Sequence, residues 1–79
     1  MKVTVTLRGV LQKKFPNVQD EIIDVPDGTT CEQALEKVGI YYKEVKNFGF
    51  VSVNNKRVMI HDELHEGDML KAYSRISGG

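Results

Sequence analysis

Residues 25–39 read VPDGTTCEQALEKVG and contain the signals that decide the fold. Residues 26–28, Pro-Asp-Gly, are turn residues that end a preceding strand. Thr30 followed by Gln33 forms a capping box, which marks the start of a helix. Apolar side chains then recur at the spacing of one helix face, at Cys31, Ala34, Leu35 and Val38. Gly39 suits the left-handed residue that ends a helix, so one amphipathic helix is expected here.

Two strands are expected before this helix. Residues 2–8 alternate apolar and polar side chains and are rich in β-branched residues, a pattern typical of a half-buried strand. Residues 21–25 form a second strand centred on two isoleucines. The segment 9–20 between them has turn residues at 15–17 and no assigned helix or strand. An N-terminal hairpin is therefore expected to lead into the helix.

Three more strands are expected after the helix. A short helical turn is predicted within residues 40–48. Strands 49–53 and 57–60 flank Asn54-Asn55-Lys56, and because asparagine tolerates positive φ, this segment predicts a tight hairpin. Residues 69–76 form the last strand after a turn containing Gly67. The order β-β-α-β-β-β predicts an α+β fold, a mixed sheet of four to five strands covered by one main helix.

Composition limits the classes of function. The chain has 79 residues, enough for one domain and no cleft between two domains, so a free-standing enzyme is not expected. Eleven basic and eleven acidic residues give a net charge of zero, which argues against nucleic-acid or membrane-surface binding. A lone cysteine, Cys31, rules out an internal disulfide, and neither a signal peptide nor a membrane-length apolar run is recognisable. We expect a cytoplasmic protein.

The sequence finishes with Ser77-Gly78-Gly79. A terminal carboxylate can be activated without altering any side chain, provided that it reaches the active site of another protein. Glycine has no Cβ, so two such residues form a slim thread that can enter a narrow channel. We therefore expect a domain of residues 1–73 followed by a flexible carrier tail of residues 74–79, with Gly79 as the reactive residue and Gly78 beside it.

Three stretches and the terminal glycines together resemble the β-grasp, ubiquitin-like sulfur carriers, the family of the molybdopterin-synthase small subunit and the thiamine-pathway sulfur carrier. The stretches are Val25-Pro26-Asp27-Gly28-Thr29-Thr30, Val51-Ser52-Val53-Asn54-Asn55-Lys56 and Leu64-His65-Glu66-Gly67-Asp68-Met69-Leu70. The resemblance covers essentially the whole chain, and the chain length is more similar to the molybdopterin-synthase subunit than to the shorter thiamine carrier.

The resemblance implies a carrier and not a catalyst. In that family an E1-like adenylyltransferase uses ATP to convert the terminal carboxylate, here on Gly79, into an acyl-adenylate. A sulfur donor then displaces AMP and leaves a thiocarboxylate. A molybdopterin-synthase-like large subunit, or another acceptor, would receive the sulfur. No cofactor or metal is expected on this chain, since neither G-x-G-x-x-G nor the P-loop pattern occurs in it.

Residues just before the glycines are the expected contacts with a partner. Tyr73 and Ile76 match aromatic and aliphatic positions of the family, and they are either docking residues or ordinary core residues of the last strand. Arg75 and Ser77 complete the predicted partner-binding set. The molybdopterin-type tail often has prolines where this chain has Ser74-Arg75, and Arg75 lies four residues before the end, as in ubiquitin.

Other interpretations remain open. Arg75 favours a ubiquitin-like modifier joined to lysines, and a non-covalent β-grasp interaction module is a third possibility. His61 and His65 resemble H-E-x-x-H, but Asp62 replaces the glutamate and Gly67 leaves little room for the helix that such a zinc site needs. Cys31 would begin a helix, where the dipole can lower a thiol pKa, although its place in the apolar stripe favours a core role.

Overall fold

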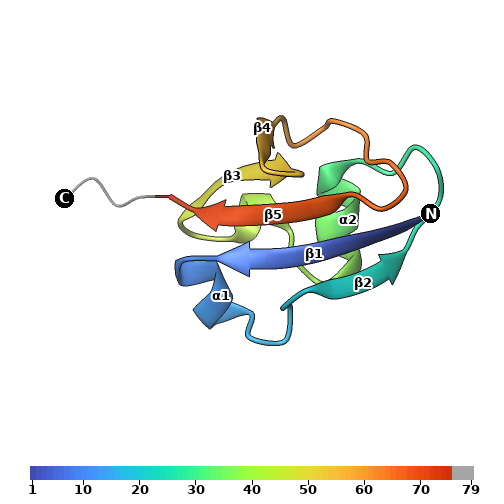
Figure 1. Cartoon of the computed structure of the whole chain (residues 1–79). Helices are drawn as coiled ribbons and strands as arrows, with labels where there is room; N and C mark the ends of the chain where they lie inside the picture. Colours follow the sequence, from blue (N-terminus) through green and yellow to red (C-terminus); the bar gives the residue numbers. More distant parts are fainter. Residues whose placement is uncertain (76–79) are drawn as a thin grey trace.

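The computed structural model describes residues 1–75, which form a five-stranded mixed sheet with one main helix on one face (Figure 1). The strand order is β2-β1-β5-β3-β4. The central strands β1 (Lys2–Arg8) and β5 (Met69–Ser74) are parallel, and the other neighbours are antiparallel. β2 (Glu21–Asp24) lies beside β1 at one edge, β3 (Phe48–Val53) lies beside β5, and β4 (Lys56–Val58) is the other edge. The predicted sheet and helix are therefore confirmed, and the bounds of β1 agree with the expectation.

The main helix, α2 (Cys31–Lys37), begins with the predicted capping box. The Thr30 Oγ1 accepts a hydrogen bond from the Gln33 N–H at 3.2 Å, and the Gln33 Oε1 accepts one from the Thr30 N–H at 3.0 Å. Gly39 has φ of +88°, the left-handed conformation expected after a helix. Both ends of α2 are thus specified by residues next to it in the sequence.

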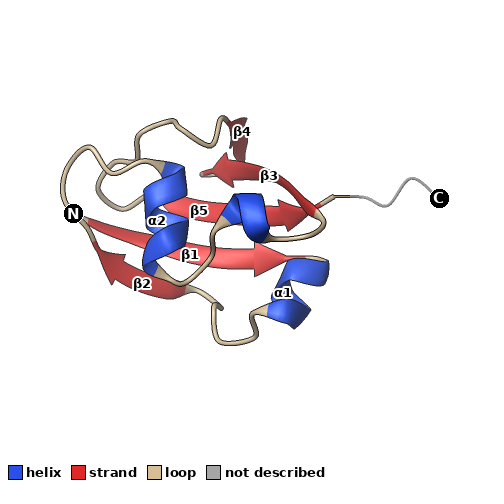
Figure 2. Ribbon diagram, turned by 180° about the vertical axis from the view of Figure 1, so that it is seen from behind, coloured by secondary structure: helices blue, strands red, loops and turns tan. Residues whose placement is uncertain are grey.

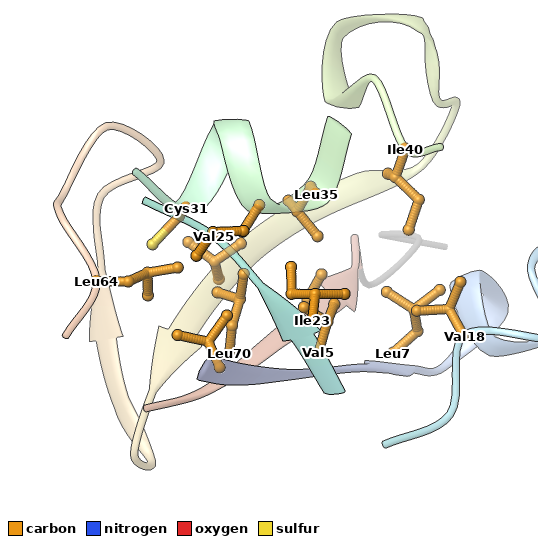
Figure 3. Packing of buried hydrophobic residues seen from close by; sticks show 14 of the residues in the cluster. Val5, Leu7, Val18, Ile23, Val25, Cys31, Leu35, Ile40, Leu64 and Leu70 are labelled. Atoms are coloured by element: carbon orange, nitrogen blue, oxygen red, sulfur yellow. The ribbon is translucent and has the colours of Figure 1, made fainter. Parts of the chain in front are cut away.

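The core lies between α2 and the sheet. Cys31 and Leu35 point from α2 toward side chains of the central strands, including Val5 and Leu70 (Figure 3). All four side chains are completely buried. Val38, the fourth member of the predicted stripe, is only partly buried because it is the C-cap residue of α2.

The hairpin between β3 and β4 has a two-residue turn. Asn54 and Asn55 have φ of 52° and 70°, and Val53 pairs directly with Lys56. This conformation suits the right-handed twist of the strands. Lys56 therefore opens β4 and is not part of the turn. The predicted strand 57–60 is wrong at both ends, since β4 ends at Val58.

Two short helices complete the chain (Figure 2). η1 (Tyr42–Glu44) confirms the helical turn expected within residues 40–48. α1 (Val10–Lys14) lies in the segment to which no element was assigned, so the predicted order omitted one helix. α1 has only five residues, and its Leu11 is completely buried. Burial against the sheet stabilises a helix too short to persist alone.

The last strand ends earlier than predicted. β5 stops at Ser74, and Arg75 is outside it. The Arg75 N–H donates to the carbonyl of Asn47, the residue before β3, so one backbone hydrogen bond joins the two segments next to the paired strands. Ile76, the expected end of the strand, lies outside the described residues. No helix within residues 1–75 is long and apolar enough to cross a membrane.

Candidate functional site

Four of the six predicted site residues lie outside the described residues: Ile76, Ser77, Gly78 and Gly79. The structure does describe the segment Tyr73–Arg75, which we call the tail base. It lies at the end of the central strand β5, between the end of β1 and the start of β3 (Figure 1). Ser74 and Arg75, the first two residues of the predicted tail, therefore lie between two neighbouring segments of the fold.

Two hydrogen bonds anchor the tail base to neighbouring segments. The Ser74 Oγ accepts a hydrogen bond from the Val10 N–H, the first residue of α1, at 3.1 Å. On the other side the Arg75 N–H donates to the Asn47 carbonyl. Together these bonds fix the position and direction of the backbone as far as residue 75.

A glycine allows β3 to approach the tail base closely. The ladder between β3 and β5 has an irregularity between Phe48 and Phe50, with Gly49 at its centre. A Cβ on Gly49 would lie 2.9 Å from backbone atoms of Ser74 and Arg75, closer than real Cβ atoms approach backbone. A larger residue here would displace the tail base.

Tyr73 belongs to an aromatic cluster on the face of the sheet opposite the core. Its ring stacks on the ring of Phe50 on β3, with centroids 4.6 Å apart and planes 10° from parallel. The guanidinium of Arg57 on β4 lies 4.5 Å from the centroid of the same Phe50 ring, a cation–π contact. Tyr73 is half-buried and is not part of the hydrophobic core. Its role in docking stays a prediction.

The residues around the tail base were not predicted from the sequence. Phe50 contacts both Tyr73 and Arg57, and because the three residues come from three strands, these contacts depend on the register of the sheet. Asn47 contributes a backbone carbonyl that accepts a hydrogen bond from Arg75, and Gly49 contributes the space left by its missing Cβ. The signal available in the sequence was the pair of aromatic residues at 48 and 50 around a glycine, which is unusual inside a strand.

Cys31 is a buried core residue. Burial, together with the negative charge of Asp62, raises the pKa of the Cys31 thiol to about 11. The position of Cys31 at the start of α2 suggested that the helix dipole lowers the thiol pKa. That expectation is wrong in direction, since the pKa is raised. A thiol that is buried and protonated at neutral pH is a poor nucleophile, and the core interpretation is confirmed.

The two histidines point to different carboxylates. The His61 Nδ1 lies 3.1 Å from the Glu32 Oε1, and the His65 Nδ1 lies 3.8 Å from the Asp68 Oδ2. Asp68 also accepts hydrogen bonds from the backbone of His65 and from the side chain of Asn54. Among the described residues, no group of three or more His, Cys, Asp or Glu side chains is arranged to bind a metal.

Comparison with solved structures shows that the chain has the β-grasp fold. A Pyrococcus furiosus protein provisionally named molybdopterin converting factor, subunit 1, matches with a TM-score of 0.75 and 20% identity over 96% of this chain and 99% of the other. SAMP1 from Haloferax volcanii matches with a TM-score of 0.76 and 22% identity over the full length of both chains. No family model and no curated protein sequence matches. The fold expected from the resemblance is therefore confirmed.

Proposed function

We propose that this chain is a ubiquitin-like sulfur carrier whose terminal carboxylate, on Gly79, is activated and converted to a thiocarboxylate. The observation that carries the proposal is the Gly78-Gly79 pair, the fourth and fifth residues after β5, which is the central strand of a β-grasp sheet. The name of the Pyrococcus furiosus neighbour supports delivery of the sulfur to molybdopterin- or tungstopterin-cofactor biosynthesis.

The chemistry needs activation because a carboxylate is a poor electrophile. An oxygen of the Gly79 carboxylate attacks the α-phosphorus of ATP, and pyrophosphate leaves. The resulting acyl-adenylate splits one difficult substitution into two easier ones. Sulfur at the oxidation level of sulfide, supplied by a donor, then adds to the carbonyl carbon, and AMP leaves with the bonding electrons. ATP and the catalytic groups come from an E1-like adenylyltransferase.

The tail base presents the carboxylate to that enzyme. Residues 76–79 follow Arg75, whose N–H donates to the carbonyl of Asn47 next to β3, and four residues extend by about 13–14 Å at most. The lack of a Cβ on Gly78 and Gly79 lets the end of the chain pass through a narrow entrance. Tyr73 and Arg75 at the surface, followed by Ile76 and Ser77, contact the rim of the partner site.

Extension of the chain after Gly79 tests the proposal. The purified protein and a variant with one alanine added after Gly79 are incubated with the E1-like enzyme, radiolabelled pyrophosphate and ATP. We expect pyrophosphate–ATP exchange with the natural chain and none with the variant, while both have the same far-ultraviolet circular dichroism. Equal pyrophosphate–ATP exchange with the two proteins would overturn the proposal.

A second candidate function uses the same carboxylate in a different way. As a ubiquitin-like modifier, the chain would be joined through Gly79 to lysine amines of target proteins. The exposed Arg75, four residues before the end, favours this candidate. Lysine-linked conjugates in extracts of the source cells would distinguish it. A non-covalent interaction module, the third candidate, requires full function after removal of Gly78 and Gly79.

A further inference from the structure

An open pocket of about 430 Å³ lies beside the tail base, at the edge of the sheet. It exists because β4 pairs only with residues 51–53 of β3 and turns away after Val58. Within the described residues, the first half of β3 therefore has no strand neighbour on this side. The segment around η1 forms the opposite wall. The volume is within the range of sites that bind small molecules or peptide side chains.

The charged residues that line the pocket all have the same sign. Lys43, Arg57 and Arg75 line it, and none of its described lining residues is acidic. All three are exposed to solvent. The whole chain has equal numbers of basic and acidic residues, so this composition is a local separation of charge. The pocket is complementary to a ligand that bears carboxylates.

Two of these cations rest on aromatic rings. The Arg57 guanidinium lies 4.5 Å from the centroid of the Phe50 ring, and the Lys43 Nζ lies 6.0 Å from the centroid of the Tyr42 ring. Contacts of this kind restrict long side chains that would otherwise sample many rotamers. The positive charges are therefore positioned before a ligand arrives, which lowers the entropy that binding must overcome.

The rest of the lining is largely apolar. The Tyr42 ring packs against the Phe48 ring with centroids 5.7 Å apart. Met59, also in the lining, is 72% exposed although it is one of the large apolar residues of the chain. Methionine adapts its shape to different apolar partners and is common on surfaces that bind peptides. An apolar side chain of a ligand would remove this surface from water.

We propose that the pocket binds an acidic segment of a protein partner that also carries an apolar or aromatic anchor residue. The carboxylates would contact Lys43, Arg57 and Arg75, and the anchor would contact Met59 and the aromatic wall. The proposal does not depend on the chemistry of Gly79. Nucleic acid is disfavoured because three cations on a chain without net charge give little attraction to a polyanion.

Nuclear magnetic resonance titration of the full chain with a blocked synthetic peptide of sequence EDLFDE tests the proposal. We expect amide shifts in residues 42–51, 57–60 and 75, which include all the residues that line the pocket, and no comparable binding of the peptide KKLFKK. Affinity should fall as salt rises from about 0.1 M to about 1 M, where the Debye length shortens from about 10 Å to about 3 Å. Shifts outside these residues, or affinity independent of salt, would overturn the proposal.

Charge substitutions provide the matched control. The double variant Lys43→Glu/Arg57→Glu should bind EDLFDE at least tenfold more weakly. The neutral variant Lys43→Gln/Arg57→Gln should show a smaller loss of affinity, and it replaces the charge reversal if the reversal disturbs folding. Lys13→Glu/Lys37→Glu makes the same charge change at exposed residues that do not line the pocket, and it should bind nearly as the natural chain does. Equal weakening by both double reversals would reject the site. Tighter binding of a single-stranded oligonucleotide in the pocket would identify nucleic acid as the occupant.

Discussion

The ring of Tyr73 lies parallel to the ring of Phe50, one strand away, with centroids 4.6 Å apart. Tyr73 is the last residue before the predicted tail, and Phe50 follows Gly49, the glycine that the tail base approaches closely. The stacked pair therefore links β5, which leads into the tail, to β3 beside it. Arg57 extends this contact to the edge of the sheet.

Removal of either ring should weaken this connection. Stacked aromatic pairs contribute about 0.5–1.5 kcal/mol beyond their buried area. We expect a double-mutant cycle of Phe50→Ala and Tyr73→Ala, measured by urea unfolding, to give a coupling free energy in this range. A cycle of Tyr41→Ala and Tyr73→Ala is the control, since no contact between those rings is found among the described residues. Coupling as small as in the control would contradict the stacked pair.

Gly49→Ala should displace the tail base. The new Cβ would lie 2.9 Å from the backbone of Ser74 and Arg75, and overpacking of this kind costs about 1–3 kcal/mol. We expect that loss of unfolding free energy together with large shifts of the Ser74 and Arg75 amide signals. Gly28→Ala is the control, because a Cβ there meets no atom within 4 Å although φ is +88°. It should leave both signals in place, and equal shifts in the two variants would refute the steric explanation.

Titration of Cys31 should lower stability in alkali. Burial raises the pKa of the folded thiol from 9.0 to about 11, so between these values the unfolded chain loses the proton and the folded chain keeps it. The contribution of this thiol to the free energy of unfolding is fully present below pH 9. It is lost as pH rises toward 11, by about 1.4 kcal/mol per pH unit at most.

Urea unfolding at several pH values measures this effect. Other groups also titrate in alkali, so the comparison is with Cys31→Ala, which lacks the thiol. We expect a steeper loss of unfolding free energy for the natural chain between pH 9 and 11. Parallel curves for the two proteins would show that the thiol ionises equally in the folded and unfolded chains.

Elements with strong local signals were predictable from the sequence. Helix α2 could be predicted because Thr30, Gln33 and Gly39 specify its ends without help from distant residues. Strand β1 could also be predicted, because its apolar and polar side chains alternate along residues 2–8. α1 could not be predicted, because its five residues are helical through the burial of Leu11 in the assembled core.

The surroundings of the tail base depend on the assembled sheet. Phe50, Arg57 and Tyr73 come from three strands, and only the register brings them together. The Arg75 N–H donates to the Asn47 carbonyl, a backbone contact that leaves no pattern in side chains. The tail stays a prediction from the sequence, and the contacts that hold its base were not predictable.

Reversal of charge at Arg75 tests the predicted docking role of the tail base. We expect Arg75→Glu to raise the KM for activation by an E1-like enzyme at least tenfold with little change in kcat, because the residue contacts the rim of the partner and not the reacting atoms. Lys37→Glu also replaces a positive charge by a negative one, at an exposed residue of α2 that does not line the pocket beside Arg75, and it should leave KM unchanged. Unchanged KM in Arg75→Glu would remove this residue from the docking surface.

Intact mass spectrometry of the protein isolated from its own cells tests the proposed chemistry of the Gly79 carboxylate. Fragmentation locates any change of mass along the chain. We expect a fraction of molecules in which one oxygen of the Gly79 carboxylate is replaced by sulfur. A terminus that carries no sulfur, in cells where the cognate activating enzyme and sulfur donor are present, would contradict it.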